Sequence, residues 1–193
     1  MVILNNNIDT GEFKLLIFER GNLRVRKLSN KDADYLVQWL SNPLVLQYYA
    51  GRDRPHNMEM VREIFFQEED SETRCIVEYG SKSIGYIQFY ELDDEGKEKY
   101  GYTNLKEKIY GTDQFIGEVD YWNKGIGKLL VSSMVNYLIT EFNVSKIVMD
   151  PETWNVRAIV CYEKCGFKKV KLLPKHELHE GELRDSWLME FSM

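Results

Sequence analysis

The sequence predicts a mixed α/β or α+β fold, in which strands and helices share one central sheet. Residues 73–79 and 83–92 are rich in β-branched and aromatic residues, and Gly80-Ser81-Lys82 between them is typical of a hairpin turn. In the second half of the chain, strand-like and helix-like segments alternate. The chain has 193 residues, 44% of them hydrophobic. It is therefore long enough to bury one sizeable core and short enough to form a single domain.

The other elements of the first half follow from capping residues and apolar spacing. Met60, Ile64 and Phe65 recur at helical intervals, and Ser and Asn side chains are preferred helix caps. We therefore expect, in order, extended structure over 13–28 with a turn at Gly21-Asn22, a helix over 31–40 capped by Ser29 or Asn30 and ended by Pro43, an aromatic-rich loop over 42–57, and a helix over 58–69.

The second half contains the clearest helical stripe in the sequence. Leu130, Met134, Leu138 and Phe142 recur at the spacing of one helix face. We expect a charged loop over 93–108, a strand over 109–117, a helix over 127–142, a short buried strand over 145–150, a helix over 155–167 that ends at Gly166, and closing strands over 168–173 and 186–191.

The charge of the chain argues against binding to nucleic acid. Its formal net charge is −6 and its pI is about 5.2, whereas nucleic-acid binding depends on clustered Lys and Arg. A cationic partner would suit this chain better. The sequence shows neither a secretory signal nor an apolar run of membrane-spanning length, so we expect a soluble, cytoplasmic protein that does not bind membranes.

The cysteines and histidines do not form a recognisable metal or disulfide pattern. Cys75, Cys161 and Cys165 are odd in number and irregular in spacing, so we expect free thiols. His176 and His179 are three residues apart with no helix evident, which differs from the His-Glu-x-x-His zinc motif. We therefore expect no metal.

A glycine-rich turn, "WNKGIGKLL" (122–130), precedes the predicted long helix. Unpaired N–H groups at a helix start can bind phosphate oxygens, and glycines let the backbone approach a ligand closely. The residues concerned are Lys124, Gly125, Ile126, Gly127 and Lys128. Taken alone, this turn could equally be a hinge, since it matches neither a Walker loop nor a dinucleotide fingerprint.

A second segment gives the turn a context. Asn155, Ala158, Tyr162, Gly166 and Phe167 form the pattern Asn-x-x-Ala-x-x-x-Tyr-x-x-x-Gly-Phe on a predicted helix. Together, the two segments resemble the GCN5-related N-acetyltransferases (GNAT). "YGTDQFIG", "YWNKGIG", "MDP" and "LPKHELHEG" further resemble the aminoglycoside 6′-N-acetyltransferases of that family, a group that shares the Trp found here at position 122.

The resemblance runs from about residue 23 to the C-terminus. It implies the GNAT fold, with a central, mixed and mostly antiparallel sheet flanked by helices. It also implies one N-acetyltransferase domain over 23–193, with 1–22 as an extension on or beside it. The implied cosubstrate is acetyl-CoA, with its pyrophosphate on the glycine turn and its pantetheine arm near Asn155, which could also simply cap its helix.

The chemistry of acetyl transfer selects candidates for catalysis. The reaction needs a neutral amine, a polarised carbonyl and a proton for the departing thiolate. Asp113 could deprotonate the amine, backbone N–H groups near Phe115 and Ile116 could stabilise the oxyanion, and Tyr162 could protonate CoA. The alternatives are a salt-bridged or loop-facing Asp113 and a Tyr162 that only packs in the core.

Acidic residues near the end of the chain suggest a polycationic acceptor. The resemblance implies that Asp150 faces the aminoglycoside, and Glu177, Glu180 and Asp185 could join it, although each could be only a turn residue or a solvated charge. The loop around Tyr48-Tyr49 could cover this substrate or belong to the core.

The sequence thus predicts an acetyl-CoA-dependent aminoglycoside 6′-N-acetyltransferase that confers antibiotic resistance, acting as a monomer or homodimer. One alternative is a GNAT enzyme that acetylates a protein N-terminus, a lysine or another small amine. A further alternative is a sensor that binds acyl-CoA without catalysis, against which the presence of both Asp113 and Tyr162 argues.

Overall fold

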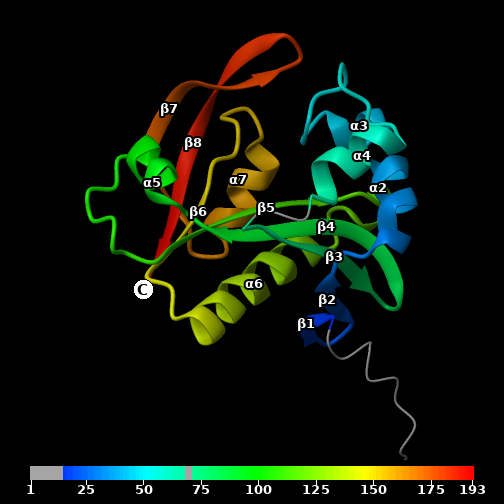
Figure 1. Ribbon diagram of the computed structural model, residues 1–193, viewed down its shortest axis with the longest axis horizontal. Coiled ribbons are helices and arrows are strands. Elements are labelled where there is room, and N and C mark those ends of the chain that lie inside the picture. Colours follow the sequence, from blue (N-terminus) through cyan, green and yellow to red (C-terminus); the bar gives the residue numbers. More distant parts are fainter. Residues whose placement is uncertain (1–14, 68–70) are drawn as a thin grey trace, which may run out of the picture.

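The computed structural model of the chain describes residues 15–67 and 71–193. A single sheet runs through this part of the chain, with strands in the order β1-β2-β3-β4-β5-β6-β8-β7 (Figure 1). The strands are β1 (Leu16–Arg20), β2 (Leu23–Lys27), β3 (Thr73–Tyr79), β4 (Lys82–Glu91), β5 (Ile109–Ile116), β6 (Lys146–Met149), β7 (Lys168–His179) and β8 (Glu182–Ser192). Neighbours pair antiparallel except β5 and β6, which are parallel. The predicted mixed, mostly antiparallel sheet is confirmed.

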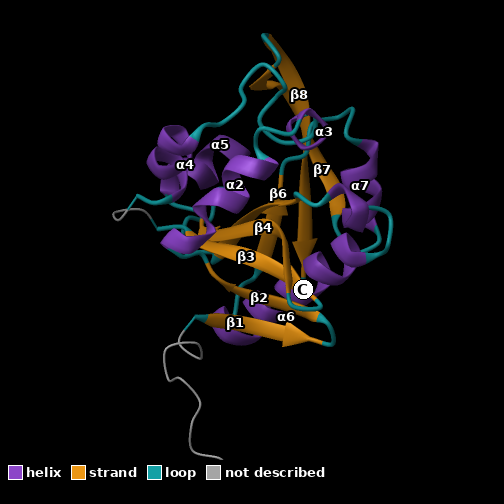
Figure 2. Cartoon of the chain, turned by 90° about the vertical axis from the view of Figure 1, so that its right-hand side faces the viewer, coloured by secondary structure: helices purple, strands orange, loops and turns teal. Residues whose placement is uncertain are grey.

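Helices cover both faces of this sheet (Figures 1 and 2). They are the short 3₁₀ turns η1 (Asn30–Asp32) and η2 (Val119–Tyr121) and the α-helices α2 (Ala33–Trp39), α3 (Pro43–Leu46), α4 (Met58–Phe65), α5 (Asp94–Tyr100), α6 (Ile126–Phe142) and α7 (Val156–Glu163). The predicted helices over 31–40, 58–69, 127–142 and 155–167 are confirmed as elements, but α4 ends at Phe65 and α7 at Glu163, both before the predicted ends.

The predicted loop over 42–57 contains a short helix, α3, so that part of the prediction is wrong. The Asn42 side chain accepts a hydrogen bond from the Leu44 N–H at 3.0 Å and caps this helix. Pro43 occupies the first helical turn, where its missing N–H costs nothing. Pro43 therefore starts a new helix after α2 has already ended at Trp39.

The charged segment 93–108, predicted to be a loop, contains α5. Asp93 caps this helix by accepting a hydrogen bond from the Gly96 N–H at 2.7 Å. Lys97 is buried, and its ammonium donates to the Leu105 carbonyl at 2.8 Å, which folds the rest of the segment back on α5. The sequence did not predict this helix, because seven mostly charged residues show no apolar periodicity.

The C-terminal hairpin is longer than the sequence predicts. Its strands β7 and β8 continue past the predicted limits of 168–173 and 186–191, and the hairpin extends beyond the body of the sheet (Figure 1). The segment after β6 ties the hairpin down, since the Trp187 N–H donates to the Pro151 carbonyl at 2.9 Å. The first four residues of "HELHEG", 176–179, lie on β7, and the last two form the turn to β8.

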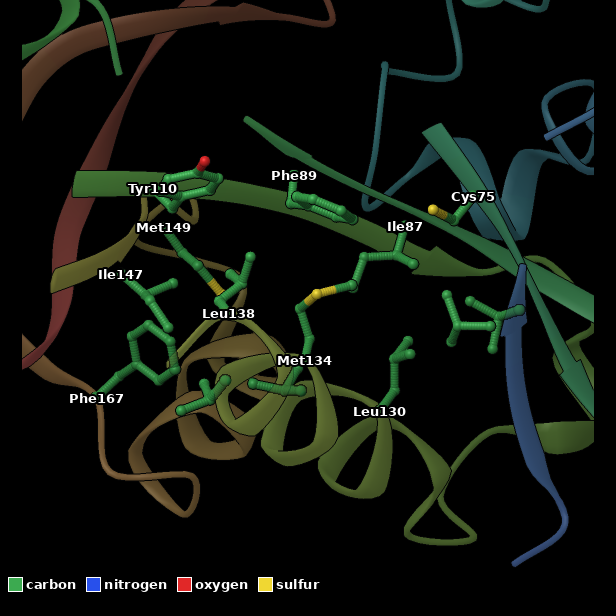
Figure 3. Packing of buried hydrophobic residues seen from close by; sticks show 14 of the residues in the cluster. Cys75, Ile87, Phe89, Tyr110, Leu130, Met134, Leu138, Ile147, Met149 and Phe167 are labelled. Atoms are coloured by element: carbon green, nitrogen blue, oxygen red, sulfur yellow. The ribbon is translucent and has the colours of Figure 1, made fainter. Parts of the chain in front are cut away.

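One face of the sheet packs against α6 (Figure 3). Leu130, Met134 and Leu138 lie one turn apart on this helix and are at most 2% exposed. They form a buried cluster with Ile87 of β4 and Ile147 of β6. Burying each such side chain contributes roughly 1.5–3 kcal/mol, so α6 is anchored firmly and its N-terminus has a defined position.

The opposite face of the sheet packs against α2 and α4. Leu36 of α2 and Val61 of α4 share a second buried cluster with Ile76 of β3. Cys75 and Val77, on either side of Ile76, belong to the α6 cluster instead. This alternation is the period of two expected of a strand that is buried on both faces.

The parallel pair β5 and β6 separates partway along β5. Their register runs from Ile109↔Lys146 to Gly111↔Val148, and β6 ends at Met149. β5 continues to Ile116 alongside β4 only. The sheet is therefore open on one side of β5, and the candidate active site lies at this opening.

The described part of the expected N-terminal extension adds a strand to the sheet. β1 pairs antiparallel with β2 across the turn predicted at Gly21-Asn22. The rest of residues 1–22 that precedes Leu15 lies outside the described residues. The division into 1–22 and 23–193 stays a prediction. Across 15–67 and 71–193, no helix has the length and apolar character of a membrane span.

Candidate active site

A cavity of about 1100 Å³ occupies the opening beside β5. Its lining includes most of the predicted site residues, namely Asp113, Phe115, Ile116, Gly125, Gly127, Lys128, Asp150, Asn155, Tyr162 and Glu177. Four predicted residues, Lys124, Ile126, Glu180 and Asp185, are not part of the lining. Residues far apart in sequence thus meet in one space large enough for an extended cosubstrate and a small acceptor.

The glycine turn forms the start of α6 at the edge of this cavity. Gly125 has φ of +78°, a conformation that favours glycine, and α6 begins at the next residue. A Cβ on Gly127 would lie 3.7 Å from the Cys161 Sγ, an ordinary contact. Seventeen residues of helix follow, so unpaired N–H groups and the positive end of the helix dipole face the cavity.

Two predicted members of the turn have other contacts. The Lys124 ammonium lies 5.6 Å from the centre of the Tyr121 ring, outside the cavity. The Ile126 side chain is 4% exposed and belongs to the α6 core cluster, which leaves only its backbone for a ligand. The turn therefore presents backbone and the Lys128 side chain to the cavity.

The strand β5 presents alternate N–H groups to the opening. The Gly117 N–H donates to β4 at 2.8 Å, so the Phe115 N–H, two residues earlier, also points to β4. The N–H groups of Gln114 and Ile116 point away from β4. In agreement, the Ile116 carbonyl accepts a hydrogen bond from the Trp122 indole at 2.7 Å. This contact also fixes the glycine turn against the end of β5.

Asp113 lies on the β5 face that packs against α2 and α4. Its Oδ2 accepts a hydrogen bond from Gln88 Nε2 at 3.0 Å, and Gln88 Oε1 accepts one from the Tyr86 hydroxyl at 2.6 Å. Burial, followed by the nearby charge of Asp150, raises the pKa of Asp113 to about 7. Within residues 15–67 and 71–193, Asp113 is held by the Gln88 amide, and no lysine or arginine forms the ion pair that the salt-bridge alternative requires.

Tyr162 reaches the cavity from α7. Its hydroxyl oxygen lies 2.7 Å from Gln114 Nε2, which donates to it. Burial raises the pKa of Tyr162 well above its ordinary value, and the hydrogen bond from Gln114 acts in the opposite direction. Asn155 caps the same helix, since its side chain accepts a hydrogen bond from the Ala158 N–H at 3.2 Å. The capping role considered for Asn155 is confirmed.

Asp150 is held by two neighbours that the sequence analysis did not select. Its Oδ2 accepts from the Tyr100 hydroxyl at 2.9 Å and lies 2.7 Å from His176 Nε2. Burial would raise the pKa of Asp150, but the hydrogen bonds from His176 and Tyr100 outweigh it and lower the pKa. Asp150, whose pKa is lowered, therefore lies near Asp113, whose pKa is raised.

The other acidic candidates differ in their surroundings. Glu177 lines the cavity, and partial burial followed by the charge of Asp150 raises its pKa. Glu180 forms a bidentate ion pair with Arg52, with Oε1 2.5 Å from Nε and Oε2 2.7 Å from Nη2. The Asp185 carboxylate accepts from the Lys175 N–H at 2.8 Å. Glu180 is thus engaged with the segment after α3, and Asp185 of β8 is engaged with β7.

The two histidines contact different carboxylates. His179 Nδ1 lies 2.8 Å from Glu152 Oε1, whereas His176 contacts Asp150. Among residues 15–67 and 71–193, no group of three or more His, Cys, Asp or Glu is arranged to hold a metal ion.

The aromatic segment between α3 and α4 contributes to both core and cavity. Tyr49 packs against Phe115, with ring centroids 4.6 Å apart. Tyr48 stacks on Trp154 at 5.6 Å, and the Arg157 guanidinium lies 4.4 Å from Tyr48. All five residues line the cavity. Both interpretations of this segment therefore hold in part.

Comparison with protein families gives a match over most of the chain. The model of the acetyltransferase (GNAT) domain family matches residues 29–174. The matched range begins at the cap of η1 and includes the glycine turn, Asp113, Asp150 and Tyr162. It therefore covers the catalytic candidates and the predicted phosphate-binding turn together.

Individual relatives agree with this match. The chain is 26% identical over 161 residues to an aminoglycoside N(6′)-acetyltransferase type 1 of Klebsiella pneumoniae, covering 82% of this chain and 80% of the relative. It is 22% identical over 175 residues to spermidine N(1)-acetyltransferase of Vibrio cholerae, covering 90% and 89%. A crystal structure of aminoglycoside acetyltransferase AAC(6′)-Ib with coenzyme A and kanamycin aligns with a TM-score of 0.69 at 26% identity, covering 88% and 94%.

Proposed function

The chain belongs to the GNAT acetyltransferase family, and we propose that it transfers the acetyl group of acetyl-CoA to the 6′-amine of an aminoglycoside. Such transfer would confer resistance, because it removes a positive charge and a hydrogen-bond donor from the drug. The observation that carries this proposal is the pair Asp113 and Asp150, whose carboxyl groups share one cavity with the glycine turn. Three further features support the proposal: the donor site, the catalytic groups and the acceptor site.

The donor site consists of the glycine turn, the exposed edge of β5 and α7. The pyrophosphate would lie on the N–H groups around Gly125 and Gly127, with Lys128 adding charge. The pantetheine arm would enter the opening where β6 has ended, alongside Asn155. A fully extended arm there could use the backbone groups of β5 that pair with no strand in the described part of the chain.

The catalytic groups would act on opposite sides of the acetyl group. Asp113, with its pKa near 7, would accept a proton from the acceptor amine. The Ile116 N–H, instead of the Phe115 N–H that points to β4, would stabilise the oxyanion. Tyr162 would donate a proton to the CoA sulfur, so no covalent enzyme intermediate is needed.

The acceptor site would recognise a polycation. Asp113, Asp150 and Glu177 line the same cavity, and no lysine or arginine forms an ion pair with any of them in the described part of the chain. Carboxylates in a partly buried site that are not paired with lysine or arginine bind ammonium groups through charge-assisted hydrogen bonds. The aromatic rings of Tyr48 and Trp154 would cover the apolar face of a sugar ring.

A polyamine is the second candidate acceptor. The same carboxylates would bind it, and the relative from Vibrio cholerae acts on spermidine by name. An aminoglycoside is favoured here because its named relatives are more similar in sequence than the spermidine enzyme is.

The test is an acceptor panel followed by product analysis. The protein and acetyl-CoA are incubated with kanamycin, tobramycin, spermidine, spermine or an N-terminal peptide, and free thiol is measured. Mass spectrometry and NMR then locate the acetyl group. We expect acetylation of the kanamycin 6′-nitrogen with kcat/KM at least about tenfold above that for spermidine. Turnover of spermidine or peptide alone would overturn the aminoglycoside assignment, and CoA binding without thiol release would overturn catalysis.

A further inference from the structure

Gln114 follows Asp113 in β5 and uses its amide on the opposite face of the strand. Its Nε2 lies 2.7 Å from the Tyr162 hydroxyl oxygen and 3.5 Å from the Met149 Sδ. Its Oε1 is buried and has no hydrogen-bond partner among the described residues. A buried, unpartnered carbonyl oxygen is unfavourable, so this arrangement calls for a physical reason.

The reverse orientation of the Gln114 side-chain amide would be less favourable for its hydrogen bonds. As placed, both N–H groups of Nε2 have an acceptor, the Tyr162 hydroxyl and the weaker Met149 sulfur. Exchanging the two ends would place the carbonyl oxygen against that sulfur and take both N–H groups away from these two acceptors. The Tyr162 contact therefore runs from Gln114 to the phenol, with Gln114 as the donor.

This direction determines where the phenol proton points. A tyrosine hydroxyl has one proton to donate and can also accept. Because Gln114 can only donate here, the Tyr162 proton must be directed elsewhere, and Tyr162 lines the cavity. The same contact stabilises a phenolate, since it opposes the effect of burial on the pKa of Tyr162.

We propose that Gln114 is a positioning residue that directs the Tyr162 proton into the cavity, toward the sulfur of the departing thiolate. This inference rests on the proposed function. In that step the amine nitrogen bonds to the acetyl carbon as the carbon–sulfur bond breaks, with its electron pair going to sulfur. Tyr162 gives its proton to sulfur, the surplus proton on nitrogen goes to Asp113, and Gln114 donates to the phenolate until solvent restores its proton.

A double-mutant cycle tests the proposal. Gln114→Met keeps the length of the side chain without donor or acceptor, Gln114→Glu can only accept from the phenol, and Tyr162→Phe removes the hydroxyl. Each variant and the double variant Gln114→Met with Tyr162→Phe are assayed by thiol release with saturating acceptor and donor. Exposed Gln38→Met is the matched control for the loss of an amide.

We expect Tyr162→Phe to lower kcat about 100-fold and Gln114→Met about 10- to 30-fold, in the range of general acid catalysis. We expect Gln114→Glu to lower kcat at least as much as Gln114→Met does. The KM for acetyl-CoA should stay within about threefold of wild type in each variant. The double variant should match Tyr162→Phe within about twofold, because Gln114 acts only through the hydroxyl.

Two results would overturn the inference. One is a loss on Gln114→Met that is as large in the Tyr162→Phe background as in wild type, since that would indicate a packing role. The other is unchanged kcat in Gln114→Met and Gln114→Glu. These outcomes are read against wild-type turnover of an amine, so they differ from failure of the proposed function, in which wild type itself releases no thiol.

Discussion

Asp113 and Gln114 are adjacent in β5, and their side chains make contacts on opposite faces of that strand. Asp113 accepts from Gln88 on the face covered by α2 and α4, while Gln114 donates to Tyr162 of α7. Asp113 and Tyr162 nevertheless line one cavity, because β6 ends beside this part of β5. Two ionisable groups from opposite faces of one strand therefore meet in one cavity, as the proposed acid–base reaction requires.

Replacing Asp113 should separate catalysis from donor binding. We expect Asp113→Asn to lower kcat about 10²- to 10³-fold, because the variant cannot accept the amine proton. Binding of CoA, measured by calorimetry, should change by less than about twofold. In wild type, the rate should rise with pH through about 7, as the Asp113 carboxyl ionises. Turnover near the wild-type level in the variant would contradict its role as the base.

The same substitution should affect stability in a pH-dependent way. The pKa of Asp113 is raised on folding, so the folded state binds this proton more tightly than the unfolded chain. Stability from this group is thus present at low pH and is lost as the pH rises from about 4 to about 7. We expect Asp113→Asn to raise the free energy of unfolding by roughly 2 kcal/mol at pH 8 and by less at pH 4, as measured in urea. A uniform change at both pH values would argue against the raised pKa.

Removing the charge of Asp150 should shift the pH dependence. Asp150 is the second cause, after burial, of the raised pKa of Asp113. Asp150→Asn should therefore lower the pKa of Asp113 and move the acid limb of the kcat profile below its wild-type midpoint near 7. Exposed Asp94→Asn, a control with the same charge change on α5, should leave the midpoint in place. An upward shift in Asp150→Asn would contradict the electrostatic coupling.

The glycine turn can be tested with a matched pair of glycines. Gly125 and Gly21 both have positive φ, +78° and +60°, and a Cβ would have no neighbour within 4 Å at either. Alanine at each should cost about 1 kcal/mol of stability from backbone strain alone. Only Gly125→Ala should also weaken CoA binding, by about tenfold, since the helix start would lose its geometry. Equal CoA affinity in the two variants would contradict the phosphate-binding role.

Substitutions should show that Glu177 of β7 contacts the acceptor, whereas Glu180, just after β7, does not. Glu177 lines the cavity, whereas Glu180 is paired with Arg52. Glu177→Gln should raise the KM for kanamycin about 3- to 10-fold, in line with loss of one charge-assisted contact. Glu180→Gln should change this KM by less than about twofold. A larger effect at Glu180 would mean that its loop contact with Arg52 shapes the acceptor site.

Much of the fold could be predicted because local signals were strong. The stripe of Leu130, Met134 and Leu138 indicated α6, and Gly80-Ser81-Lys82 indicated the β3–β4 hairpin. α3 and α5 escaped prediction, since both are short and depend on the caps Asn42 and Asp93 more than on apolar periodicity. The length of β7 and β8 also escaped, because contacts with the segment after β6 hold them.

Some residues of the candidate site could likewise be predicted from the sequence, and others could not. Asp113, Tyr162 and the glycine turn carry local motifs, so the sequence indicated them directly. Tyr100 lies in no motif, and the motif that contains His176 does not indicate its partner; both residues reach Asp150 only because α5 and β7 fold against the end of β6. Glu180 looked like a further acidic candidate until the fold placed it against Arg52. Single charges in a sequence do not say which partner they will meet.

The sequence by itself determined most of the strands and helices, the acidic balance and the two motifs, because periodicity and motif spacing are properties of neighbouring residues. Only the tertiary structure decided that β5 continues past the end of β6, that the Phe115 N–H points to β4 while the Ile116 N–H points away from it, and that Gln114 donates to Tyr162. These features depend on strand register and on contacts between distant segments. The sheet, once assembled, directs the side chains of two adjacent residues of β5 to different partners around one cavity.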